Sequence, residues 1–270
     1  MAWRDLKVGD LHFAVRTDSW EFTAWLDHAL GAYITDEEAE VKYSFVVGDA
    51  GGRGSVSKTF SIFYWGTVPV VKTLHFPTAI HAFLTELEVM QMSPRRDGLF
   101  LRAVPVTDGD AVGLVPVSMI MGMGDETRTA ARAGLSFGAP MALRLDPSTG
   151  LVSPVPASLA LPRDAHDLLS TVTQSGGLDR LVLAPEVKID AVFAMSTGPI
   201  DADANLMEPA SRASTLYRIA PWILNLDSFG SSSLEVLGGM VQGARGYTLT
   251  PISDRTRLFE ALLAGLKEAR

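Results

Sequence analysis

The segment 113–146 constrains the fold of this chain more than any other stretch of the sequence. It continues an apolar run, 111–117, into a glycine-containing turn, and a short helical candidate follows at 127–133. A second apolar run at 141–145 comes after that candidate helix. This succession of strand, turn, helix and strand predicts an α/β core in which the turn lies at the junction between a buried strand and a helix.

The turn lies where a phosphate-binding loop would lie, but its charges are reversed. A P-loop reads G-x-x-x-x-G-K-[ST], because its glycines admit the phosphates to backbone N–H groups, its lysine neutralises them and its hydroxyl holds magnesium. Here Gly122 and Gly124 supply glycines, whereas Asp125 stands for the lysine and Glu126 for the hydroxyl. Two unit charges ~4 Å apart interact by ~4 kcal/mol at an effective dielectric of ~20, which is roughly a thousandfold in affinity. We therefore expect weak triphosphate binding.

The rest of the chain divides by pattern into an N-terminal α+β lobe, 1–93, and an α/β core, 94–270. Alternating apolar residues predict an antiparallel lobe, in which GDAGGRG forms a plain hairpin turn. In the lobe we expect strands at 11–16, 41–47, 56–64 and 68–73, and helices at 20–30 and 77–90. In the core we expect strands at 98–106, 111–117, 141–145, 151–155, 191–195 and 247–250, and helices at 210–219, 233–244 and 254–267. Ser253 is the expected cap of the last helix.

Composition excludes several classes of function. The formal net charge of −8 argues against a nucleic-acid partner, and the absence of cysteine excludes disulfides and cysteine-ligated metals. The longest nearly apolar run, 111–124, is too short for a membrane span. The N-terminal residues MAWRDLKVGD contain no apolar signal core, so we expect a cytoplasmic protein without a membrane partner. The five histidines show no metal-ligand spacing, and we expect no metal site.

Two stretches carry a resemblance to a known family. The order DGLFLRAVPVTDGDAVGLVPVSMIMGMGDETRTAARAGL, followed by LRLDPSTGLVSPVPASLALP, resembles the HPr kinase-related proteins of the phosphoenolpyruvate-carboxykinase-like fold. The resemblance extends over 11–263 in layout and is specific over 97–162. It implies a mixed-sheet α/β core with a smaller antiparallel N-terminal lobe and C-terminal helices. Members of the family are ATP-dependent kinases that phosphorylate serine in a small protein or peptide, some of them in peptide natural-product pathways.

The resemblance also shows which functional positions are altered. Gly122, Gly124, Thr127 and Arg128 are the remnant of the P-loop, whereas Asp125 and Glu126 replace the lysine and the hydroxyl. The position of the metal-binding acid falls near Ala139, so that acid is lost as well.

Several residues of this region allow more than one interpretation. Asp125 and Glu126 either cap the helix that follows, bind a cation, or act as acid and base in a remodelled catalytic site. Arg128 and Arg132, which share a helical face, either bind an anion or lie in solvent. The alternating methionines at 119, 121 and 123 are either packed or form an adaptable surface for a peptide.

Two hypotheses about function follow. The first is an HPr kinase-like pseudoenzyme, an accessory subunit that binds a protein or peptide in a biosynthetic pathway, needs no cofactor and forms a homo- or hetero-oligomer. The second is an ATP- and magnesium-dependent kinase, or another transferase, with a displaced phosphate site or with catalysis by Asp125 and Glu126.

Overall fold

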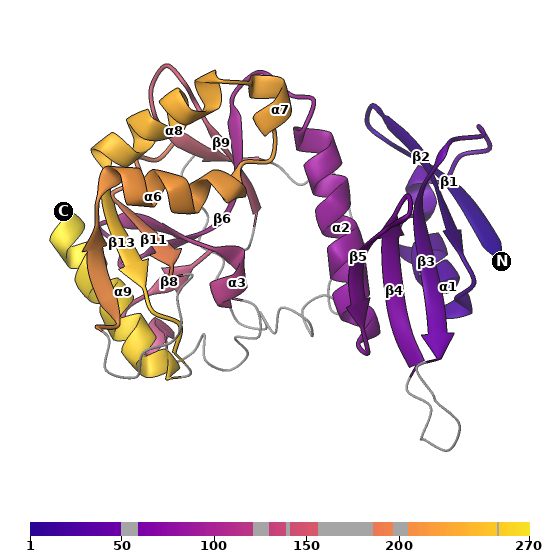
Figure 1. Ribbon diagram of the computed structural model, residues 1–270, viewed down its shortest axis with the longest axis horizontal. Helices are drawn as coiled ribbons and strands as arrows, with labels where there is room; N and C mark the ends of the chain where they lie inside the picture. The colour runs from indigo at the N-terminus through magenta and orange to yellow at the C-terminus, as the bar shows by residue number, and fades with distance from the viewer. Residues whose placement is uncertain (50–58, 121–129, 139–140, 156–185, 197–204, 253) are drawn as a thin grey trace. The chain divides into compact units, whose positions relative to one another are not determined.

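The computed structural model describes residues 1–49, 59–120, 130–138, 141–155, 186–196, 205–252 and 254–270 (Figure 1). The chain is a mixed α/β protein with two mixed sheets. Its described residues divide into two compact units, Met1–Gln91 and the part from Met92 onward. Each unit has its own sheet and its own buried apolar residues, which form one large cluster in the first unit and clusters on both faces of the sheet in the second.

The first unit contains a five-stranded sheet in the order β1-β2-β3-β4-β5. The strands are β1 (Ala2–Val8), β2 (Leu11–Thr17), β3 (Val41–Asp49), β4 (Thr59–Trp65) and β5 (Val68–Thr73), and the helices are α1 (Trp20–Ala29), η1 (Gly31–Tyr33) and α2 (Phe76–Met92). Apolar residues of α1 and α2 pack with the inward residues of the strands into one cluster rich in aromatic rings. Phe22 of α1, for example, stacks on Phe45 of β3 with ring centroids 4.1 Å apart.

The prediction of an antiparallel lobe is wrong at one strand pair. β2 pairs with β3 in parallel, whereas the other neighbouring strands of this sheet are antiparallel. The reason is the connection: α1 lies between β2 and β3 and returns the chain to the same end of the sheet, as a parallel pair requires. β3 and β4 do form the antiparallel hairpin expected around GDAGGRG, although residues 50–58 lie outside the described residues.

The second unit contains an eight-stranded sheet in the order β10-β9-β6-β7-β11-β13-β12, with β8 paired to β6. The strands are β6 (Leu99–Thr107), β7 (Val112–Val115), β8 (Ser136–Phe137), β9 (Met141–Leu145), β10 (Val152–Pro154), β11 (Ala191–Met195), β12 (Met207–Ala210) and β13 (Arg245–Leu249). The helices are α3 (Val117–Ile120), α6 (Arg212–Ile219), η2 (Ala220–Trp222), α7 (Leu226–Phe229), α8 (Ser232–Gly243) and α9 (Arg255–Ala269). β11 pairs in parallel with both β7 and β13, and the other pairs are antiparallel.

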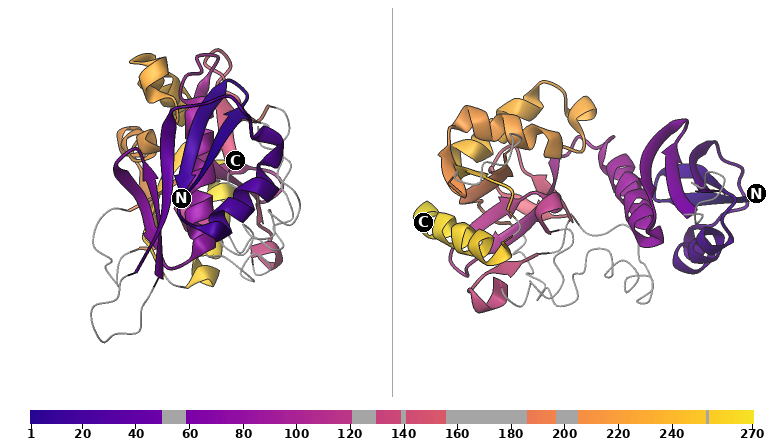
Figure 2. Two further views of the ribbon diagram at one scale, coloured as in Figure 1. Left: turned by 90° about the vertical axis from the view of Figure 1, so that its right-hand side faces the viewer. Right: turned by 60° about the horizontal axis from the view of Figure 1, so that its bottom comes forward.

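Helices cover both faces of this sheet. Phe193 of β11 lies in the cluster that contains the apolar face of α9, whereas its neighbour Val192 lies in the cluster that contains α6 and α8. The views of Figure 1 and Figure 2 agree that α9 and the pair α6 and α8 lie on opposite sides of the strands. A strand buried on both faces reads as a continuous apolar run, which is why AVFAM was recognisable in the sequence.

The strands expected at 98–106 and 111–117 are found as β6 and β7, which pair antiparallel. The helices expected in the C-terminal part are found as α6, α8 and α9. The cap of α9 was predicted wrongly: Asp254 takes this position, and its carboxylate accepts hydrogen bonds from the backbone N–H groups of Thr256 and Arg257. An aspartate accepts such bonds as well as a serine does. Within the described part of the chain, no helix is both long and apolar enough to cross a membrane.

Candidate functional site

The structure describes both sides of the segment that carries the predicted site, but not the segment itself. β7 ends at Val115, and α3 begins at Val117, two residues later. Residues 130–132 are helical, and Gly134 follows them with φ at 85°, as expected for a glycine that ends a helix. The predicted site residues between these two points lie outside the described residues: Gly122, Gly124, Asp125, Glu126, Thr127 and Arg128. Ala139, the position of the missing metal-binding acid, also lies outside them.

The segment begins at the edge of the sheet where parallel strands end. β7, β11 and β13 run in the same direction, so their carboxyl ends lie along one edge, which we call the carboxyl edge. β9 also runs in this direction, because β6 is antiparallel to both β7 and β9. In open α/β sheets, ligands bind outside the carboxyl ends of the strands. The topology therefore places the start of the predicted loop where a ligand site is expected.

Two arginines reach this edge from distant parts of the chain. Arg218, near the end of α6, donates a hydrogen bond from Nη1 to the carbonyl oxygen of Met195, the last residue of β11 (3.0 Å). Arg255, the first residue of α9, donates from Nη1 to the carbonyl oxygen of Met119 in α3 (3.4 Å). Sequence reasoning missed both, because no spacing pattern connects residues this far apart. They bring positive charge to the edge at which the predicted loop begins.

The structure decides between the two interpretations for Met119 only. Met119 is 3% exposed and packs in the cluster between the sheet and α9, so it is a core residue and not part of a peptide-binding surface. Arg132 is exposed at the end of its helical turn, which agrees equally with anion binding and with a solvated face. Met121, Met123 and Arg128 lie outside the described residues.

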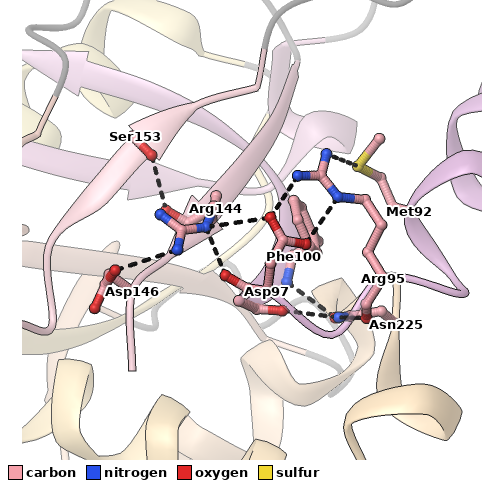
Figure 3. Close-up of polar contacts among 9 residues, drawn as sticks. Met92, Arg95, Asp97, Phe100, Arg144, Asp146, Ser153 and Asn225 are labelled. Carbon is pink, nitrogen blue, oxygen red and sulfur yellow. Dashed lines mark hydrogen bonds and ion pairs between the residues drawn. The ribbon is translucent and has the colours of Figure 1, made fainter. Parts of the chain in front are cut away.

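A network of charged residues lies at the end of β9 (Figure 3). Arg95 pairs with Asp97 at 2.6 Å, and Arg144 of β9 pairs with Asp146 at 3.2 Å. Arg144 Nε also lies 3.8 Å from a carboxylate oxygen of Asp97, which connects the two pairs. Next to the network, Asn225 is fully buried, and its side chain is hydrogen-bonded to the main chain at the start of β6.

Asp146 of this network is held in its charged form. The hydroxyl of Ser148 donates to Asp146 Oδ1 at 2.6 Å, and the backbone N–H groups of Ser148 and Thr149 donate to the same oxygen. These hydrogen bonds, with the nearby Arg144, lower the pKa of Asp146 to about 2. A carboxylate with this pKa and these partners stabilises the turn between β9 and β10 and is a poor proton donor at neutral pH.

The described residues contain no group of three or more acidic or histidine side chains arranged to hold a metal ion. Comparison with protein-family models, with curated proteins and with solved structures found no match to this chain.

Proposed function

We propose that this chain is an HPr kinase-like pseudokinase, a protein that has lost ordinary ATP binding and instead binds a protein or peptide as an accessory subunit of a biosynthetic pathway. The observation that carries the proposal is the reversed charge at Asp125 and Glu126, in a segment that starts at the carboxyl edge of parallel strands. A cytoplasmic location is part of the same proposal.

The order of elements around this segment supports the family assignment. A hairpin, β6 and β7, leads into the segment, and a strand that contains Phe137 follows it. The strands β9 and β10 then flank the turn that begins at Asp146 in LDPSTG. In the family that the chain resembles, a hairpin strand leads to the P-loop, a helix and a Gly-aromatic step follow, and an acidic strand comes next, so the order of the described elements supports the assignment.

The two described arginines at the carboxyl edge differ in their role from the missing P-loop lysine. Arg218 and Arg255 each donate to a main-chain carbonyl, so part of their hydrogen-bonding capacity serves the fold. A P-loop lysine, in contrast, directs its whole charge at the phosphates. With Asp125 and Glu126 adding negative charge, we expect the free energy of binding for a triphosphate to be several kcal/mol less favourable than in an intact P-loop, by the ~4 kcal/mol estimate for one charge pair.

The outer strand β5 of the first sheet supports the proposal of a peptide partner. The two outer strands of this sheet differ: β1 is covered on its outer side by Ile34, which forms a bridge with Leu6, whereas β5 has no second strand neighbour among the described residues. Next to this open edge, Trp65 is 57% exposed and Val68 59% exposed. An exposed apolar edge strand is the arrangement on which an extended peptide adds a further strand.

The nucleotide part of the proposal is tested by restoring the charge pattern. The double substitution Asp125→Lys with Glu126→Ser rebuilds the G-K-S sequence of a P-loop, and calorimetry with ATP and magnesium should show affinity at least a hundredfold above that of the unmodified chain. Glu235→Lys, an exposed position on α8, is the control for added positive charge. If the double variant and the control bind nucleotide equally, the charge at 125 and 126 is not the reason for weak binding.

The peptide part is tested at β5. Extended decapeptides selected by phage display on the full chain should bind at least tenfold more weakly when Val68 and Val70 are both changed to lysine, because charged side chains block strand addition. Val47→Lys is the matched control, since Val47 is also partly exposed but lies on the inner strand β3. Equal losses in both variants, or no loss in either, would remove β5 as the docking edge.

Arg218 and Arg255 favour one alternative, a transferase with a displaced phosphate site. Their positive charge at the carboxyl edge suits an anionic substrate, and Asp125 and Glu126 would then supply acid and base. The substitutions Asp125→Asn and Glu126→Gln should abolish such an activity and leave the melting temperature unchanged. Turnover that survives both changes would dismiss the two carboxylates as catalytic.

A further inference from the structure

A cavity of about 540 Å³ lies in the second unit at the amino ends of β11 and β13, opposite the carboxyl edge. It opens beside the first residues of β13 and beside Asp190, which directly precedes β11. Because β11 is five residues long, this amino edge is about 13 Å from the carboxyl edge. Its polar lining residues are Asp190, Arg212, Thr215, Gln242, Arg245, Tyr247 and Glu268. All of these residues are described by the structure, and the cavity size falls within the range of small-molecule sites.

Close packing of α6 on β13 shapes the cavity. A Cβ atom on Gly246 would lie 1.9 Å from Thr215 Oγ1, so only glycine allows the helix to approach this closely. Thr215 is 1% exposed, and its hydroxyl donates to the carbonyl oxygen of Ser211 at 3.1 Å. As a result, Arg212 in the first turn of α6 and Arg245 at the start of β13 line the same cavity.

The carboxylates that line the cavity already have partners in the protein. Asp190 Oδ2 accepts a hydrogen bond from the backbone N–H of Val112 at 3.0 Å, and Oδ1 lies 3.8 Å from Lys188 Nζ. Glu268 Oε2 accepts from the hydroxyl of Tyr247 at 3.2 Å and lies 3.9 Å from Arg245 Nη1. Burial of Tyr247 raises its pKa, so this hydroxyl remains a donor at neutral pH.

The donors are less completely used. Within the described residues, the guanidinium of Arg212 and the side-chain amide of Gln242 have no hydrogen-bond or ion-pair partner. The guanidinium of Arg245 faces Glu268 at the outer limit of an ion pair and also interacts with the side chain of Tyr247, but its side chain is 61% exposed and has donors left over. A guanidinium offers five N–H donors and no acceptor, so the unused hydrogen-bonding capacity of the lining suits a ligand that brings acceptors.

We infer that this cavity binds a small organic anion. Its charged group is a phosphate monoester or a carboxylate, which Arg212 binds and Arg245 also contacts. Arginine is suited to this task because its planar fork pairs with both oxygens of such a group. The volume leaves room for the organic part of the ligand beside Gln242. This site is separate from the predicted loop and does not depend on whether that loop binds ATP.

The experiment titrates the full chain with three probes by calorimetry: glycerol 2-phosphate, succinate and the neutral control glycerol. We expect saturable binding of glycerol 2-phosphate, succinate or both, at least tenfold weaker in Arg212→Gln and weaker to a smaller degree in Arg245→Gln. Which of the two anions binds more tightly distinguishes a phosphate ester from a carboxylate ligand. Circular dichroism melts establish that the variants are folded.

Arg257→Gln is the matched control, because Arg257 is also an exposed arginine in the first turn of a helix. It lies about 16 Å along α9 from Glu268 by the rise of an α-helix, so the variant should bind both anions as the unmodified chain does. The inference is overturned if neither anion binds, if glycerol binds as well as the anions, or if Arg212→Gln binds them unchanged. Gly124→Trp, which blocks the predicted loop, should leave anion binding intact, and this separates the inference from the proposed function.

Discussion

Replacing the buried Asn225 with alanine should destabilise the second unit by about 3–4 kcal/mol. Asn225 is fully buried just before α7, and its side chain makes three hydrogen bonds of 2.9 Å to the main chain around the start of β6. Oδ1 accepts from the N–H of Phe100, and Nδ2 donates to the carbonyl oxygens of Arg95 and Gly98. Alanine would leave these groups without their partner, and each lost bond of this kind costs about 1–1.5 kcal/mol. This is a large share of the roughly 5–15 kcal/mol that stabilises a domain.

Urea unfolding followed by circular dichroism measures this loss, and hydrogen exchange of the β6 amides assigns it to the second unit. Asn205→Ala is the matched control, since Asn205 is exposed and contributes its main-chain carbonyl, not its side chain, to the bond from Thr250. We expect a change below about 0.5 kcal/mol for the control, as for most surface substitutions. A loss below about 1 kcal/mol in Asn225→Ala would contradict this prediction, because it would mean that water or local rearrangement satisfies the freed groups.

Two further predictions concern stability. Gly246→Ala should lower the free energy of unfolding by about 1–3 kcal/mol, since its Cβ would meet Thr215 Oγ1 at 1.9 Å. Gly239→Ala, on the exposed face of α8, should raise it by about 0.5–1 kcal/mol. Thermal melts of both variants compare the two effects. The pKa of Asp146 falls from its ordinary value of 3.8 to about 2 on folding, chiefly through the hydrogen bond from Ser148, so this group stabilises the fold above pH 4 and loses that contribution as the pH falls from about 4 to 2. An NMR titration of the Asp146 carboxyl measures its pKa, and a value near 4 would contradict the prediction.

The sequence was sufficient for elements whose residues repeat a local pattern. β6, β9 and β11 follow from apolar runs, and α9 follows from helical periodicity. Strand direction did not follow, because alternation is the same in parallel and antiparallel strands, and so the parallel pairing of β2 with β3 was missed. β1 was missed as well, since Arg4, Asp5 and Lys7 interrupt its apolar pattern.

The sites depended on contacts between distant residues, which a single sequence does not encode locally. Asn225 bonds to residues more than 120 positions earlier in the chain. Arg212 and Arg245 line the same cavity because Gly246 has no side chain and α6 can therefore pack closely on β13. The reversed charge at Asp125 and Glu126, in contrast, is visible in the sequence alone and stays a prediction about function.

The proposed function requires that the loop of this α/β core cannot hold a nucleoside triphosphate. Calorimetry of the unmodified chain with ATP and magnesium tests it most directly. We predict no saturable heat of binding up to millimolar ATP. A Kd in the micromolar range that disappears in Gly124→Trp would contradict the claim and would establish the segment after α3 as a working nucleotide site.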